Sequence, residues 1–368
     1  MFKFKKLLLI GILMTTVLIL AGCGGQSTQE APKGEAPKED AKPITLNLAH
    51  FWPATHQMET KIVKNFAAEI EKATNGKVKI VSFPAGTLVP AAETYDGVVK
   101  GVADLGISVY AYNRGRFPVV ETFLVPGIEF NNSVAASEAL MEGIQKFDPQ
   151  ELKDTHHLMS FAAGPGDLFT KKPIRKMEDL KGLQIGATAG LRADAVGLLG
   201  ATPVVQPMPE WYESLSKGIM NGGVAPLETM KGFRLGEVTA DYITLTPFLY
   251  NQAFFVTMNN DKWNSLPADV QQAITDVSKK YAKEVLAPWF DSIDKGGLVA
   301  VKEKKKVEVI NLSNEEKAKW LAKLKPLEDQ YVKTLNDKGL NGADIVKGVK
   351  ELADKYNAQY PDKAPYTK

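Results

Sequence analysis

The residues that could carry out chemistry are few in this 368-residue chain, and their spacing matches none of the common catalytic motifs. The sequence contains no Walker phosphate loop, no GxGxxG, no GxSxG nucleophile elbow and no HExxH zinc motif. A secreted hydrolase or lyase is an alternative, but it would need a nucleophile or a metal that the sequence does not place. We therefore predict a protein that is not an enzyme and that has no catalytic residue, metal or cofactor.

The four histidines are the remaining candidates for a metal site. His50 and His56 fall in one expected loop and could chelate an ion together, but no pair of carboxylates stands out near them. His156 and His157 are neighbours at the start of an expected strand, so their side chains point to opposite faces and cannot share one ion. The favoured prediction is that none of the four binds a metal.

Aromatic residues recur where expected strands end. They are Phe51 and Trp52 after the strand 44–50, Tyr110 and Tyr112 after 104–109, Trp211 after 203–206, and Phe248 and Tyr250 in a later connection. One aromatic side chain at such a place is usually a packing residue. Several of them at different strand ends predict a shared pocket, because pockets for small molecules are mostly apolar with few polar groups.

Strands and helices alternate along the chain, which predicts an α/β fold with two lobes. Residues 44–109 follow the order strand, helix, strand, helix, strand, which builds a parallel sheet covered by helices. The alternation returns between residues 157 and 258, and the chain turns helical after Pro267, with a capping box at Ser313 and Glu316. We place the first lobe at 44–166 plus about 248–290 and the second at 167–247 plus about 291–368. Ligands of such sheets bind beyond the carboxyl ends of strands, so a cleft between the lobes is expected.

The N-terminus predicts export and a lipid anchor. Three lysines precede an apolar run of about 14 residues, short of the roughly 20 that span a membrane, and "LAGC" follows at 20–23. Residues 1–22 are expected to be a signal peptide. Cys23, the lone cysteine, is expected to carry a lipid at the outer face of the cytoplasmic membrane; an uncleaved anchor or an accidental cysteine is the alternative. Residues 23–43 contain no aromatic or aliphatic anchor and predict a disordered tether.

Four stretches of the chain resemble the solute receptors of tripartite ATP-independent periplasmic (TRAP) transporters, the dicarboxylate-receptor family. They are "AAEIEKATNGKVKIVSFPAGTLVPAAETYDGVVKGVADLGISV" at 67–109, "KKPIRKMEDLKGLQI" at 171–185, "GATPVVQPMPEWYESLSKGIMNGG" at 200–223 and "MNNDKWNSLPADVQQAI" at 258–274. The resemblance implies a two-lobed, class II-type periplasmic-binding-protein fold with a long helix that spans both lobes. It also implies an organic anion as ligand and a sodium- or proton-driven permease as partner.

Two polar positions of that family are replaced in this chain. The family arginine that pairs with the ligand carboxylate corresponds to Gly186, and the family's Asp-Gly followed by Glu-Asn appears as Asn221 and Gly222 followed by Gly223. Glycine at position 186 is expected to leave room for a bulkier or more apolar ligand beside Thr188.

An anion could be held by other groups. The helix start after Gly190 offers free backbone N–H groups. Arg192 in its first turn could supply the charge, or Arg114 after the strand 104–109. The other possibility is that Arg192 is solvated and the ligand only weakly polar.

The sequence therefore predicts a lipid-anchored receptor that captures a small organic anion, in particular a carboxylate, and delivers it to the membrane subunits of a TRAP permease. A ligand sensor on the same fold that signals to a membrane receptor is equally compatible with it. The formal net charge of +2 argues against a nucleic-acid binder, which would concentrate basic residues on one face. A monomer is expected.

Overall fold

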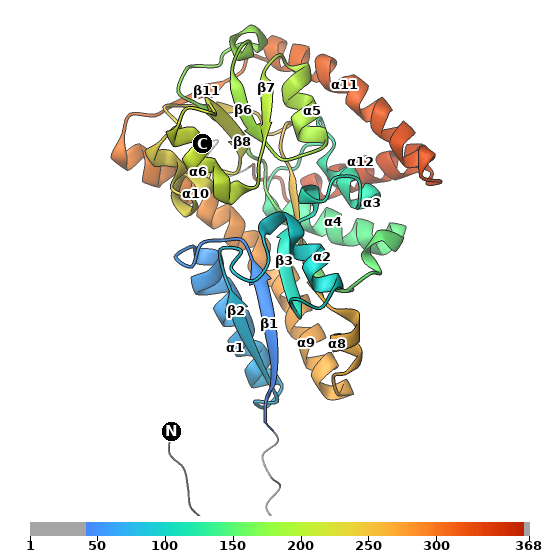
Figure 1. The fold of residues 1–368 in the computed structure, drawn as a ribbon. Helices are drawn as coiled ribbons and strands as arrows, with labels where there is room; N and C mark the ends of the chain where they lie inside the picture. Colours follow the sequence, from blue (N-terminus) through green and yellow to red (C-terminus); the bar gives the residue numbers. More distant parts are fainter. Residues whose placement is uncertain (1–41, 364–368) are drawn as a thin grey trace, which may run out of the picture. The chain divides into compact units, whose positions relative to one another are not determined.

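The computed structural model describes residues 42–363, which belong to one compact unit (Figure 1). The expected signal peptide, Cys23 and nearly all of the expected tether lie outside the described residues. Within 42–363, no helix is long and apolar enough to cross a membrane.

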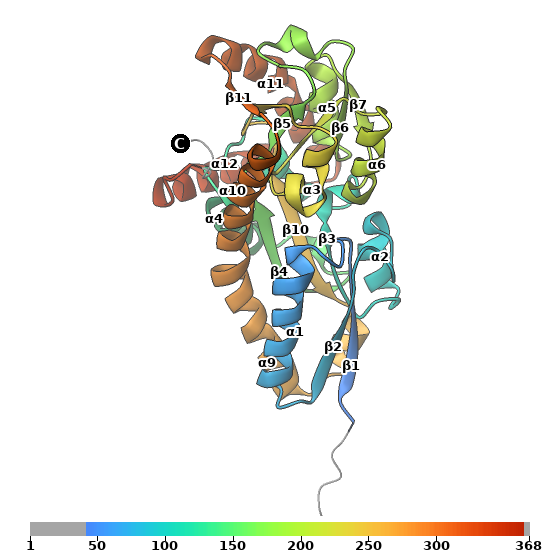
Figure 2. The same cartoon turned by 90° about the vertical axis from the view of Figure 1, so that its left-hand side faces the viewer.

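The first sheet has five strands in the order β2-β1-β3-β10-β4. β1 is parallel to β2 and β3, as the alternation of strands and helices predicts, whereas β10 runs antiparallel between β3 and β4 (Figure 2). We call this sheet and the helices packed on it the first lobe. Its elements are β1 (Ile44–His50), α1 (Lys64–Ala73), β2 (Val78–Phe83), α2 (Thr94–Val99), β3 (Leu105–Val109), α3 (Pro118–Glu121), α4 (Ser133–Phe147), β4 (His156–Ala163) and β10 (Gln252–Met258).

The second sheet has six strands in the order β11-β9-β5-β8-β6-β7. β6 is parallel to β7 and β8, and β5 runs antiparallel to both of its neighbours, β8 and β9. We call this sheet and its helices the second lobe. Its elements are β5 (Asp167–Thr170), β6 (Gln184–Ala187), α5 (Leu191–Leu198), β7 (Thr202–Val205), α6 (Trp211–Ser216), β8 (Gly222–Ala225), α7 (Thr229–Gly232), β9 (Tyr242–Leu245) and β11 (Glu308–Asn311).

A continuous helix connects the two lobes, as the resemblance implied. It consists of α9 (Ala268–Lys280), a π-helical turn at Tyr281–Val285 and α10 (Leu286–Lys304). α9 packs on α1 of the first lobe (Figure 2). α10 packs on α7 of the second lobe. The π-helical turn has a local cause, because Pro288 lacks the N–H that would bond the carbonyl four residues earlier.

The remaining helices are α8 (Asn260–Asn264), α11 (Asn314–Asp337) and α12 (Gly342–Gln359). The capping box predicted at the start of α11 forms only in part. Ser313 caps the backbone N–H of Glu316, but the Glu316 carboxylate accepts from Met177 N and from Trp320 Nε1 instead of returning to the cap. This carboxylate therefore ties α11 to the second lobe. α12 packs on α4 of the first lobe, although residues after 291 were expected to lie with the second.

Candidate binding site

A small cavity lies where the strand ends of the two sheets meet. Its lining residues are Phe51, Trp52, Val109, Tyr112, Thr188, Gln206, Met208, Trp211, Pro226, Glu228, Thr229, Phe233, Tyr250, Gln252, Phe254 and Phe290. Several directly follow β1, β6, β7 or β8, so the cavity occupies the place where open α/β sheets bind ligands. It measures about 30 Å³, room for one or two water molecules. In this conformation the cavity is therefore too small for an organic ligand.

Aromatic side chains form most of the cavity wall. Phe51 and Trp52 stack with ring centroids 4.0 Å apart, and Trp52 lies 5.6 Å from Phe254. Across the boundary between the lobes, Phe51 stacks on Phe233 at 6.2 Å. Tyr112 also crosses it, because its hydroxyl accepts the N–H of Met208 at 3.0 Å. Such a wall suits a flat, apolar ligand ring.

Arg192 lies behind this wall and is held by residues that line it. Gly190 adopts φ 78° before α5, which turns the chain so that Arg192 falls in the first helical turn. The Arg192 guanidinium donates to Thr188 Oγ1, to Gln252 Oε1 at 2.8 Å and to the carbonyl of Asn251 at 2.5 Å. The side chain is only 5% exposed. The structure thus brings together Thr188 and Arg192, two residues that the sequence proposed for the site.

The charge of Arg192 has no anionic partner in the part of the chain that the structure describes. Its Nε is buried without a hydrogen bond. Burial lowers the pKa of Arg192, and the groups that oppose this shift are the rings of Tyr250 and Tyr112, not carboxylates. A buried charge without a counter-ion is costly. An anion delivered to this guanidinium would relieve that cost.

Trp211 occupies the space beside Gly186 that was expected, from the sequence, to hold a bulkier ligand. Gly186 of β6 and Gly223 of β8 are paired across the sheet. A Cβ at Gly186 would lie 2.8 Å from Met220 Sδ and 3.0 Å from Trp211 Cη2, and a Cβ at Gly223 would also collide with the indole. The two glycines therefore form a platform for Trp211, whose Nε1 donates to the carbonyl of Gln206 at 2.9 Å. Glycine at 186 makes room for the indole and does not open the cavity directly.

Four residues that the sequence proposed for the site lie elsewhere. Tyr110 is in the core of the first lobe, where its hydroxyl bonds Ser160 Oγ at 2.7 Å. Phe248 packs edge-on against Trp320 of α11. Arg114 is largely exposed and pairs with Asp194 at 3.3 Å. Asn221 binds the backbone of Gln184 at the opposite end of β6 from Thr188.

Other cavity residues were missed by the sequence analysis. They are Val109, Gln206, Met208, Pro226, Glu228, Thr229, Phe233, Gln252, Phe254 and Phe290. Gln206 directly follows β7, so the rule used for aromatic residues would have found it if that rule had included amides. Gln252 is the first residue of β10, and a rule for strand ends does not find it. Glu228 has no such signal, because it lies in a turn before α7.

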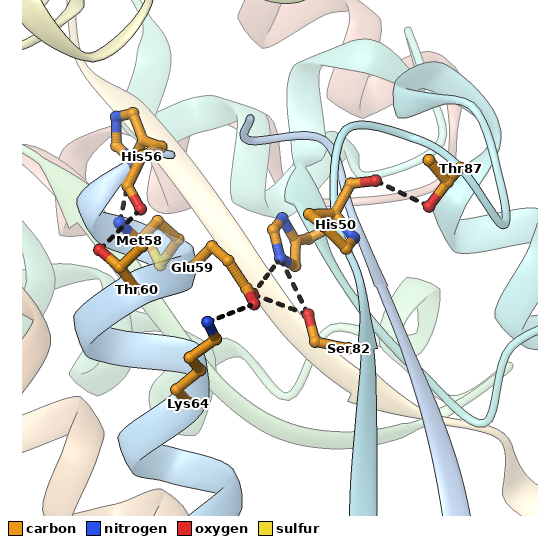
Figure 3. Close-up of polar contacts among 9 residues, drawn as sticks. His50, His56, Met58, Glu59, Thr60, Lys64, Ser82 and Thr87 are labelled. Carbon is orange, nitrogen blue, oxygen red and sulfur yellow. Dashed lines mark hydrogen bonds and ion pairs between the residues drawn. The ribbon is translucent and has the colours of Figure 1, made fainter. Parts of the chain in front are cut away.

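The polar cluster around His50 does not have the geometry of a hydrolase triad (Figure 3). Glu59 Oε2 lies 3.0 Å from His50 Nε2 and 2.8 Å from Ser82 Oγ, and Ser82 Oγ is 3.2 Å from the same Nε2. A triad needs the acid on one ring nitrogen and the nucleophile on the other. Here both use Nε2, while Nδ1 is buried without a partner. The cluster is a packed polar network in which burial lowers the pKa of His50.

His56 belongs to a second, separate histidine–carboxylate pair. Its Nε2 lies 2.9 Å from Glu228 Oε2, and its Nδ1 accepts the N–H of Met58. His50 and His56 thus bond different carboxylates and do not converge on one point. The His56 pair joins the loop after β1 to the second lobe.

Comparison with known proteins identifies the family of the chain. Residues 48–334 match the model of bacterial extracellular solute-binding protein, family 7. The chain is 25% identical over 323 residues to the C4-dicarboxylate-binding periplasmic protein of Rhodobacter capsulatus, which covers 84% of this chain and 91% of that protein.

Two solved structures are similar along almost their entire length. A marine metagenome TRAP solute-binding protein specific for aromatic acids, in complex with 3-hydroxybenzoate, is 30% identical with a TM-score of 0.81, and covers 86% of this chain and 100% of that one. A TRAP solute-binding protein of Rhodoferax ferrireducens with copurified benzoate is 26% identical with a TM-score of 0.79, over 86% and 99%. The chain therefore belongs to family 7 of the bacterial extracellular solute-binding proteins, the non-enzymatic receptors of TRAP transporters.

Proposed function

We propose that the protein captures an aromatic monocarboxylate in the cavity between the lobes and delivers it to a TRAP permease. The observation that carries this proposal is the buried guanidinium of Arg192, which has no carboxylate partner among the described residues and lies beside a wall of aromatic rings. The aromatic acids bound by the two similar structures support the same ligand class.

The carboxylate of the ligand pairs with Arg192 in this proposal. The guanidinium has five N–H groups, and three bonds to Thr188, Gln252 and Asn251 leave part of that capacity unused. A hydrogen bond between charged groups contributes about 1.5–3 kcal/mol. The ring of the ligand replaces water against Phe51, Trp52 and the other rings of the wall.

Closure of the lobes completes the site. Three contacts join the lobes or their connections around the cavity: Tyr112 with Met208, His56 with Glu228, and Arg192 with Gln252. An aromatic ligand needs more room than the present cavity of about 30 Å³, so it favours a closed state in which the lobes close around the ligand with a wider cavity between them. Because it binds only the folded protein, it also stabilises the fold by about 2.7 kcal/mol at a hundredfold excess over Kd.

The location of the receptor follows from its N-terminus. Cys23 carries the lipid, and the tether lets the receptor reach the permease while it remains at the membrane. This part of the proposal rests on the sequence "LAGC" and the short apolar run before it.

Calorimetric titration of the purified protein with benzoate, 3-hydroxybenzoate and succinate tests the ligand class. The aromatic acids should bind, and succinate should bind more weakly. Arg192→Met should lower the affinity for benzoate by about ten- to a hundredfold. Arg114→Met, the matched control at an exposed arginine that does not line the cavity, should change it by less than about threefold. Unchanged benzoate binding by Arg192→Met, or tightest binding of succinate, would contradict the proposal.

A further inference from the structure

Glu228 is the one carboxylate among the residues that line the cavity in the described part of the chain. It is 5% exposed and is held firmly. Its backbone N–H donates to Asp294 Oδ1 on α10 at 2.8 Å, and its carbonyl accepts the N–H of Gly232 at 2.7 Å. A buried carboxylate in a binding cavity needs hydrogen-bond donors.

Only one of the two carboxylate oxygens of Glu228 has a donor among the described residues. His56 Nδ1 accepts the N–H of Met58, so His56 Nε2 carries a proton and donates it to Glu228 Oε2 at 2.9 Å. This arrangement requires only a neutral imidazole. Oε1 forms no hydrogen bond with a described residue, and a carboxylate can only accept. Oε1 is not fully enclosed, so the hydroxyl of a ligand can reach this acceptor.

Glu228 does not serve as the counter-ion of Arg192. No ion pair joins the two side chains, whose bonds go to Thr188, Gln252 and Asn251 on one side and to His56 on the other. The acceptor therefore lies in the cavity wall, and the cation lies behind that wall as a separate group. A ligand that carried an anionic group and a donor could satisfy both.

We propose that the ligand is a hydroxylated aromatic carboxylate, whose carboxylate pairs with Arg192 and whose hydroxyl donates to Glu228. This inference rests on the proposed function and adds the substituent that the cavity selects. His56 is a positioning residue, because its N–H fixes one carboxylate oxygen and leaves the other for the ligand. Unsubstituted benzoate has no hydroxyl to donate to Glu228. It should therefore bind more weakly, because an acceptor in the cavity would stay without a donor.

The same carboxylate excludes dicarboxylates. A second negative charge on the ligand would face Glu228, and like charges in contact strongly disfavour a complex. Isophthalate, which carries a second carboxylate on the ring, should therefore bind more weakly than benzoate. Because of this repulsion, the ligand specificity of this protein should differ from that of a receptor for dicarboxylates.

Titration of the full-length protein with benzoate, its three hydroxy isomers and isophthalate tests the inference. At least one hydroxybenzoate should bind about tenfold or more tightly than benzoate. Glu228→Gln keeps an oxygen for His56 but replaces the other oxygen with an amide donor. In this variant the advantage of the hydroxyl should fall below about threefold, and isophthalate should bind more tightly than it does to the wild type.

The matched control is Glu59→Gln, which alters a second buried carboxylate bonded to a histidine Nε2 that does not line the cavity (Figure 3). Its preference for hydroxybenzoate should equal that of the wild type. Equal losses for benzoate and hydroxybenzoate in Glu228→Gln would show a structural role and overturn the inference.

The wild-type protein also tests the inference without any variant. Equal affinities for benzoate and all hydroxy isomers would overturn it, and so would tighter binding of 3-(aminomethyl)benzoate, which brings a cationic donor. Absence of binding by every aromatic acid would instead overturn the proposed function, and this inference with it.

Discussion

The guanidinium of Arg192 lies over the ring of Tyr250, with 3.8 Å between Cζ and the ring centroid. Tyr250 is itself fixed, because its carbonyl accepts the N–H of Gly166, and a Cβ at Gly166 would lie 2.7 Å from the tyrosine ring. The connection between β4 and β5 thus supports the ring, and the ring supports the cation. The orientation of Arg192 is therefore set before a ligand arrives.

Replacement of Tyr250 should show what this support contributes. Tyr250→Phe keeps the ring and should change the affinity for benzoate by less than about twofold. Tyr250→Leu removes the ring beneath the guanidinium and should weaken benzoate binding by roughly three- to thirtyfold, since a cation–π contact contributes about 0.5–2 kcal/mol. Calorimetric titration measures both.

Tyr250 also lines the cavity, so the loss of a ring contact with the ligand must be separated from the loss of support for Arg192. Phe233→Leu removes an aromatic wall residue that makes no ring contact with Arg192. It should weaken benzoate binding less than Tyr250→Leu does. Equal effects of the two leucine variants would show that the ring of Tyr250 acts only as a wall.

The partly buried histidine His157 should make the fold sensitive to acid. Burial lowers the pKa of His157 to about 4, and its Nε2 lies 2.8 Å from Ser160 Oγ. The unfolded chain takes up a proton near pH 6.5, whereas the folded chain does so only near pH 4. This contribution to stability is therefore complete above about pH 6.5 and is lost as the pH falls towards 4. Between pH 7 and pH 5 the loss is about 2 kcal/mol.

Urea denaturation of the wild type and of His157→Gln at pH 7 and pH 5 measures this loss. From pH 7 to pH 5 the change in the free energy of unfolding should be about 2 kcal/mol less favourable for the wild type than for the variant. Glu121 and Glu151 act in the opposite direction, because burial raises the pKa of each to about 7. They are present in both proteins, so the difference isolates His157. An equal change in both proteins would contradict the prediction.

The fold could be predicted from the sequence to a large extent because its signals are local. The stripe Met58, Ile62, Phe66 and Ile70 is buried along one face, as the four-residue spacing indicates. The antiparallel insertions of β5 and β10 could not be predicted, because pairing between strands distant in the sequence leaves no local pattern. α4, which covers the first sheet, was not predicted either.

The candidate site could be predicted mainly where a residue lies a few positions after the end of a strand. Phe51, Trp52, Tyr112, Thr188 and Trp211 satisfy that rule and line the cavity. Tyr110 also follows a strand, yet its side chain points into the core. The backbone turns after β3, so the side chains of Tyr110 and Tyr112 point in different directions. The position of Glu228 in the cavity wall depends on contacts among a turn, a loop from the other lobe and the long helix. Only the tertiary structure shows these contacts.

Cys23 lies outside the described residues, and its role remains a prediction from the sequence. Cys23→Ser should abolish lipidation, so the protein should appear as an unprocessed precursor or in the released fraction. Fractionation of cells followed by mass spectrometry of the N-terminus distinguishes these forms. Processing and membrane attachment identical to those of the wild type would show that the "LAGC" sequence is not a lipidation signal.

Gly186→Ala should weaken the binding of aromatic acids by displacing Trp211. The added Cβ would lie 2.8 Å from Met220 Sδ and 3.0 Å from Trp211 Cη2, and both side chains are fully buried, so neither can move freely. The indole should shift towards the cavity and reduce its volume. Forcing a methyl group into a packed interior costs typically 1–3 kcal/mol. We therefore expect a lower melting temperature, altered tryptophan fluorescence and weaker binding of benzoate.

Gly197→Ala provides the matched control for this substitution. Gly197 lies in α5, close in sequence to the site, and a Cβ there would meet nothing within 4 Å. Alanine in a helix is favoured over glycine by about 0.5–1 kcal/mol, so this variant should be slightly more stable and bind benzoate as the wild type does. The contrast between the two variants assigns the effect to the contact with Trp211. If Gly186→Ala instead left the fluorescence and the affinity unchanged, the glycine platform would not determine the position of the indole.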